Sequence, residues 1–200
     1  MHRVAVLALL RAHTARTLDA HEAAMTAATV QFLEAHADCF LRSCLPGHLT
    51  GSAWIVSPDR RRTLLTHHRK LDKWLQLGGH ADGDPDLLAV AMREAHEESG
   101  LTRLRPLGRE PFDVDRHWIP ERKGEPAHWH HDLRFMIEAD PEEPLVLSNE
   151  SKELAWVDVA RVTELNPEES MARMVRKTAL RAEAPSSNIQ APASGGAIHT

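Results

Sequence analysis

The stretch "GGHADGDPDLLAVAMREAHEESGL" at residues 78–101 constrains this chain more than any other. It predicts a helix over residues 85–99, since the pattern supplies both a start and a stop. Asp84 can cap the helix, Pro85 suits its first position, and Gly100 suits a left-handed residue just past its end. A glycine pair therefore leads through a short polar turn into a well-bounded helix.

Three glutamates edge the side of this helix that is predicted to be buried. At about 100° per residue, Glu94, Glu97 and Glu98 fall within one sector of the helix. Apolar residues fall in or beside that sector, namely Leu87, Val90, Ala91 and Ala95. Because packed structure screens charge weakly, carboxylates held together there favour a cation among them.

A hard divalent cation suits such a group of carboxylates. Magnesium prefers oxygen ligands in octahedral geometry and usually shares its coordination shell with water and substrate phosphates. The group therefore favours a phosphate-bearing substrate. The alternative is a helix with ordinary surface ion pairs, such as Arg93 with Glu97 one turn later. The spacing of the charges alone leaves both interpretations open.

The same stretch resembles the Nudix box, which reads Gly, five residues, Glu, seven residues, and Arg-Glu-aliphatic-x-Glu-Glu-x-Gly-aliphatic. The residues that fall on this pattern in register are Gly79, Arg93, Glu94, Ala95, Glu97, Glu98, Gly100 and Leu101. Pro85 departs from it, because the family usually has a structural glutamate there, in a salt bridge with the box arginine. Asp82, Asp84 and Asp86 are the candidates to replace that glutamate.

The resemblance extends over residues 49–182 and implies an α+β fold, the Nudix α/β/α sandwich with a mixed sheet. It implies that the carbonyl of Gly79 and the three glutamates hold Mg²⁺ or Mn²⁺, and that Arg93 orients these acids. The implied activity is that of a pyrophosphohydrolase, which hydrolyses a phosphoric anhydride in a nucleoside diphosphate linked to another moiety. Examples are ADP-ribose, a dinucleoside polyphosphate or a nucleoside triphosphate. The alternative is a quiet module of this fold that binds or senses nucleotide.

Two further segments supply candidate site residues. In this family a loop glutamate outside the box often acts as general base, and Glu150 and Glu153 are candidates, unless they are ordinary surface acids. Strand alternation would put His128 and His130 on one face. We predict that this pair contacts the substrate.

Two tryptophans accompany these histidines. We predict that Trp118 or Trp129 stacks on the substrate; the alternative is a solvated strand edge with one buried aromatic. The number of histidines is also compatible with a zinc site, but no sequence spacing identifies a set of four tetrahedral ligands.

The remaining pattern divides the chain into three regions. We expect an N-terminal helical extension at residues 1–45, a Nudix hydrolase domain at 46–182, and a disordered tail at 183–200 that is rich in Pro, Ser, Ala and Gly. The predicted elements are a short helix followed by one over 18–40 and a closing helix capped by Asn166. The predicted strands lie near 52–58, 63–77 (a second strand with its continuation into the glycine pair), 104–107, 114–119, 133–138 and 154–157. The extension either covers the core or builds a homodimer interface.

Composition limits the partners. The 200 residues carry a formal net charge of −5 with acids and bases interspersed, whereas a nucleic-acid binder would show a basic stripe. Cys39 and Cys44 form no disulfide framework, which favours a reducing cytoplasm. No apolar run approaches the roughly 20 residues of a membrane span. We expect a soluble, cytoplasmic protein whose partner is a small nucleotide, with no nucleic acid and no membrane.

Overall fold

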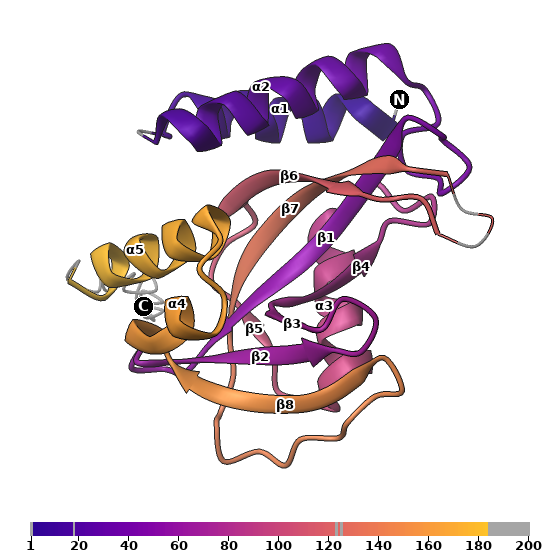
Figure 1. The fold of residues 1–200 in the computed structure, drawn as a ribbon. Helices are drawn as coiled ribbons and strands as arrows, with labels where there is room; N and C mark the ends of the chain where they lie inside the picture. The colour runs from indigo at the N-terminus through magenta and orange to yellow at the C-terminus, as the bar shows by residue number, and fades with distance from the viewer. Residues whose placement is uncertain (1, 18, 123, 125, 184–200) are drawn as a thin grey trace, which may run out of the picture.

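The computed structural model describes residues 2–17, 19–122, 124 and 126–183. Its strands are β1 (Gly47–Val56), β2 (Arg62–His68), β3 (Lys73–Leu75), β4 (Leu77–His80), β5 (Arg105–Pro106), β6 (Asp113–Ile119), β7 (His128–Glu138) and β8 (Ser151–Asp158). Its helices are α1 (His2–Thr14), α2 (Ala20–Ala35), α3 (Leu87–Ser99), α4 (Val162–Leu165) and α5 (Glu169–Glu183), with a 3-10 turn η1 at Val159–Arg161. Within the described residues, the strands form one mixed sheet with helices around it (Figure 1).

Strand β1 is the central element of this sheet. It pairs in parallel with β7 from Gly47 opposite Trp129 to Val56 opposite Glu138, and antiparallel with β2 and β4. Strand β6 continues the sheet beyond β7, and β8 pairs with β2. Every residue of β1 is buried, as expected for a strand covered on both faces. The predicted α+β class with a mixed sheet is confirmed.

Alternation along β1 divides the core into two clusters. Leu49 and Ile55 point into the first cluster, with residues of α1, α2 and α3, whereas Trp54 points into the second, against α5. Figure 1 shows α1 and α2 lying across β6 and β7, and α5 at the other side of the sheet. The sheet is therefore packed between two sets of helices.

The N-terminal extension packs on the sheet. Val6, Leu10 and Leu33 are fully buried in the same cluster as Leu49 of β1. The Oγ1 of Thr29 lies 3.0 Å from Nδ1 of His131 on β7, within hydrogen-bonding distance. The extension thus covers the core, the first of the two roles that the sequence left open.

The start of α3 differs from the prediction. Asp86, not Asp84, caps the helix, because its Oδ1 accepts a hydrogen bond from the amide of Ala89 at 3.1 Å. Asp84 accepts one from the amide of Asp86 at 2.9 Å, and this local turn leaves Pro85 outside the helix. The predicted C-terminal signal is confirmed, since Gly100 adopts a left-handed φ of 72°.

The closing helix also begins later than predicted. Asn166 ends α4 and does not cap α5, which starts at Glu169. Its side-chain amide donates to the carbonyl of Trp74 at 2.9 Å, so tertiary contact with β3 fixes this asparagine. Residues 184–200 of the predicted tail lie outside the described residues, and Glu183 is the last residue of α5. None of the described helices is long and apolar enough to cross a bilayer.

Candidate active site

The glycine pair of β4 lies directly against the acidic side of α3. Register with β1 places Gly79 opposite Gly51 at the edge of the sheet. The amide of Gly78 donates a hydrogen bond to Oε1 of Glu98 at 3.0 Å. A Cβ added to Gly79 would lie 2.4 Å from Cδ of Glu94. The carboxylate of Glu94 therefore occupies the space that any larger residue at position 79 would need.

Glu98 is the most buried of the three box glutamates, with 9% of its surface exposed. Burial raises the pKa of this carboxyl to about 8, and the negative charges of Glu94, Glu150 and Glu97 add to the rise, against the hydrogen bond from Gly78. The surroundings of this carboxyl therefore disfavour its negatively charged form. A cation bound beside it would restore the ionised form.

Arg93 ties the acids to the glycine turn. Its Nη2 donates to Oε1 of Glu94 at 2.8 Å and to the carbonyl of His80 at 3.1 Å. Its Nε lies 3.9 Å from Oε1 of Glu97. Arg93 therefore contacts Glu94 and Glu97, whereas Glu98 is held by the amide of Gly78.

The three aspartates near Pro85 each have another role. Asp82 forms a bidentate ion pair with Arg42, at 2.6 and 2.7 Å. Asp84 and Asp86 make the turn and the cap of α3. Of the three, the charge of Asp82 contributes to the raised pKa of Arg93. The negative charges that act on Arg93 thus come from Glu94 and Glu97 and, with a smaller effect, from Asp82.

Residues 48–178 match the family model described as the NUDIX domain. The chain belongs to the NUDIX family. No curated protein matches it. Two solved structures share the Nudix fold: the Ap4A hydrolase of C. elegans (binary complex; TM-score 0.54, 18% identity, 66% of this chain and 96% of that chain) and the dihydroneopterin triphosphate pyrophosphohydrolase of E. coli (TM-score 0.53, 19% identity, 66% and 95%). At these identities the likeness shows the fold alone.

The two candidate bases of this Nudix chain differ in position. Glu150 lies in the turn before β8, where its carbonyl accepts a hydrogen bond from the amide of Arg69 at 2.9 Å, and its charge acts on Glu98. Glu153 lies on β8 opposite His67. Both side chains are exposed. The structure therefore brings Glu150, and not Glu153, into electrostatic contact with the box.

The predicted substrate-binding residues lie on both faces of β7. His128 and His130 share one face, with their Nε2 atoms 3.1 Å apart, as alternation predicted. Trp129 projects to the other face, where its ring pairs with Trp118 at 5.0 Å between centroids and with Arg116 at 4.2 Å. Trp118 is half exposed. The tryptophans and the histidines are therefore not brought together.

A buried network of charges was missed at the sequence level. Arg134 of β7 contacts Asp132 at 2.8 Å and Asp113 at 3.2 Å, and Arg173 of α5 contacts Asp113 at 2.8 Å. Alternation in Asp113–Asp115 and Asp132–Phe135 places the charges of each strand on one face, but it does not identify their partners on other elements. Asp132 and Arg134 lie on the same face of β7 as His130. Their network with Asp113 and Arg173 joins β6, β7 and α5.

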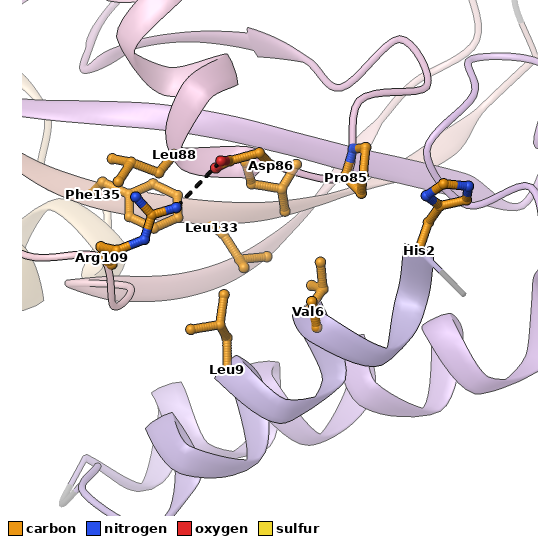
Figure 2. A pocket seen from close by; sticks show the side chains of 11 residues that line it. His2, Val6, Leu9, Pro85, Asp86, Leu88, Arg109, Leu133 and Phe135 are labelled. Atoms are coloured by element: carbon orange, nitrogen blue, oxygen red, sulfur yellow. Dashed lines mark hydrogen bonds and ion pairs between the residues drawn. The ribbon is translucent and has the colours of Figure 1, made fainter.

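An apolar cavity of about 370 Å³ lies away from this chemistry. Figure 2 shows Val6 and Leu9 of α1 facing Leu88 and Leu133 across it. An ion pair between Arg109 and Asp86, 3.4 Å long, lies at its side. The cavity is bounded by α1, the start of α3 and β7, and the three box glutamates lie outside it.

Gly79→Ala should lower kcat/KM by about 10- to 100-fold, because the new Cβ must displace the carboxylate of Glu94 and an ångström-scale displacement carries a cost of this order. The melting temperature should change little, since the displaced atoms end a flexible side chain. Gly108→Ala is the matched control, because its Cβ would meet no atom closer than 4.0 Å. Equal activity of the two variants would contradict the role given to Gly79.

Proposed function

We propose that this Nudix chain is a metal-dependent pyrophosphohydrolase, acting on a phosphoric anhydride bond in a nucleoside diphosphate linked to another moiety. ADP-ribose, dinucleoside polyphosphates and nucleoside triphosphates are the substrate classes. The observation that carries the proposal is the convergence of Glu94 and Glu98 on the glycine pair, with Arg93 bound to Glu94. A module that only binds nucleotide has no need for a buried carboxylate of raised pKa at this point.

The residues present fit Mg²⁺ or Mn²⁺. The carbonyl of Gly79 and the carboxylates of Glu94, Glu97 and Glu98 offer only oxygen ligands, which these ions prefer. The raised pKa of Glu98 is consistent with a carboxylate whose counter-charge is a bound ion. When bound, the ion would neutralise phosphate oxygens and lower the pKa of an attacking water.

The side chains around this proposed site have different roles. Arg93 orients Glu94, and the amide of Gly78 holds Glu98. We assign to Glu150 the role of general base, which takes the proton from the water that attacks phosphorus, with Glu153 as the second candidate. Comparing Glu150→Gln with Glu153→Gln separates them, because loss of the base should lower kcat by about 10²- to 10⁴-fold, whereas loss of a surface acid should leave it nearly unchanged.

Substrate contacts complete the proposal. We propose His128 and the partly exposed His130 as substrate contacts on one face of β7, and Trp118 or Trp129 as the residue that stacks on the nucleobase on the other face. Activity across ADP-ribose, dinucleoside polyphosphates, nucleoside triphosphates and nucleotide sugars, with and without divalent ion, tests the whole assignment. Nucleotide binding without turnover of any substrate would instead support the sensing module. A cytoplasmic location and a domain over residues 46–182 stay predictions.

Magnesium or manganese at millimolar concentration should raise the melting temperature by several degrees. An ion that binds only the folded state stabilises it by about 2.7 kcal/mol at a hundred times its Kd, and each kcal/mol corresponds to about 2–4 °C in a chain of this size. Thermal scans of metal-stripped protein, with sodium chloride at equal ionic strength as control, measure the shift. An unchanged melting temperature would count against the oxygen-ligated site.

A further inference from the structure

Histidine rings gather at one end of the sheet. They come from four strands: His48 of β1, His80 of β4, His117 of β6, and His128 and His130 of β7. Six pairs of these rings have centroids between 4.7 and 5.2 Å apart. Only the fold assembles this group, since its members lie up to 82 residues apart between His48 and His130.

Strand register explains the assembly. The parallel pairing of β1 with β7 puts His48 beside His130, and antiparallel pairing puts His117 of β6 opposite His130. Alternation returns His128 to the same face. In β4, His80 lies opposite Thr50, two residues along β1 from His48. The group therefore rests on paired strands, which hold side chains more rigidly than loops do.

Three of these histidines have the geometry of metal ligands. One ring nitrogen each from His48, His128 and His130 lie within 4.8 Å of one another. The Nε2 atoms of His128 and His130 are 3.1 Å apart. Two nitrogens that bind a tetrahedral zinc ion at about 2.0–2.1 Å are about 3.3–3.4 Å apart. Small movements of the rings would bring all three nitrogens to one ion.

The tautomer of His128 suits this role. Its Nδ1 lies 2.7 Å from the carbonyl oxygen of Pro126, which can only accept, so Nδ1 carries the proton and donates. In the neutral ring, Nε2 then presents its lone pair to the cluster. Metal-binding histidines usually donate their second nitrogen to a carbonyl or carboxylate in this way, which fixes the ring for the ion.

We propose that His48, His128 and His130 bind one divalent transition-metal ion of the zinc class. Imidazole nitrogen favours zinc, copper or nickel over magnesium, so this site is distinct from the oxygen ligands of the Nudix box. With three histidine ligands, a fourth position would stay open for water. The ring of His80 lies 4.9 Å from that of His48. The proposal does not depend on hydrolysis.

Competition with a chromophoric chelator, using the full metal-stripped chain, tests the site. We expect one zinc ion per chain to bind tightly and affinity to fall at least about 10- to 100-fold in both His128→Gln and His130→Gln, because even outer residues of zinc sites cost that much. Cobalt should bind with the intense visible absorption of a four- or five-coordinate nitrogen site. Oxygen ligands in octahedral geometry would give a weak band.

Two control variants distinguish the alternatives. His36, Asp38 and Cys44 form a second group of ligand atoms within 4.8 Å of one another among the described residues. Cys44→Ser should leave zinc binding unchanged, and so should Glu98→Gln in the box. Loss of zinc binding in either control, or full affinity in both histidine variants, would overturn the proposal.

If a histidine variant does not fold, measurements on the wild-type protein test the proposal instead. Circular dichroism identifies that case. The cobalt spectrum of the wild type then decides: a weak band, or no zinc bound under chelator competition, rejects the three-histidine site, while an intense band at one equivalent supports it.

Discussion

Glu98→Gln should lower kcat by at least about 100-fold, because the variant keeps the shape of the side chain but loses the charge that holds a metal ion and activates water. The Oε1 of glutamine can still accept the hydrogen bond from the amide of Gly78. The metal-free variant should be at least as stable as the parent, since a buried carboxyl beside Glu94 and Glu97 is replaced by a neutral group.

Both quantities are measured on the same preparations, kcat with saturating metal ion and melting temperature without it. Glu164→Gln is the control for charge removal at an exposed position outside the box, since 59% of the Glu164 side chain is accessible. A normal kcat combined with a lower metal-free melting temperature would show that Glu98 is a structural partner and not a catalytic residue.

The pH dependence of the free energy of unfolding tests the raised pKa of Glu98 independently of activity. The folded-state pKa of Glu98, about 8, lies above its ordinary value of 4.5. Its favourable contribution to stability is therefore fully present below pH 4.5 and is lost as the pH rises through 8. One pKa unit corresponds to about 1.4 kcal/mol, so a loss of a few kcal/mol is the upper bound. Metal-free Glu98→Gln should lack this decline in a series of denaturant titrations.

Asp113→Asn should reduce the free energy of unfolding by about 3–5 kcal/mol, because it removes the negative charge of a buried carboxylate that pairs with two buried guanidinium groups. Asp113 is fully buried and contacts Arg173 at 2.8 Å, Arg134 at 3.2 Å and Lys177 at 3.2 Å. Glu110→Gln is a matched control, since it breaks an exposed pair with Arg16 that is expected to contribute at most about 1 kcal/mol. Urea denaturation compares the two.

The stability contributed by Asp113 depends on pH in the opposite sense to that contributed by Glu98. Burial opposes ionisation of Asp113, but Arg173 and Arg134 outweigh it and hold its pKa at about 2. The stabilisation is present above the ordinary pKa of 3.8 and is lost as the pH falls through 2. A difference between wild type and Asp113→Asn below 1 kcal/mol at pH 7 would contradict the assigned role of the network.

The Nudix box could be recognised in the sequence because its proposed ligands lie on one glycine turn and one helix, where the sequence spacing determines their relative positions. The histidine cluster was not, since His48 and His130 meet only through the parallel register of β1 and β7. The same holds for Asp113 and Arg173, which belong to different elements. Long-range register is a property of the whole sheet and leaves no local spacing to read.

The errors at the helix starts have a local cause. Asp84 and Asp86 are both able to cap a helix, and the turn closed by Asp84 gives the cap to Asp86. Asn166 carries a capping side chain that β3 engages instead. Sequence identifies the residues that can cap, but competition between neighbours and tertiary contacts decides which one does.

Helices α1 and α2 pack into the same hydrophobic cluster as β1 and β7, so the packed core extends beyond the segment that matches the family model. A chain starting at residue 46 would expose Leu49 and Leu133 to water where Leu10 and Leu33 now cover them, at about 25 cal/mol for each Å² of apolar surface. Lys177 near the C-terminus also pairs with Glu22 of α2 at 2.6 Å, which joins the two ends of the described chain. Truncation at the family boundary therefore cuts through a hydrophobic core and an ion pair, and not through a linker.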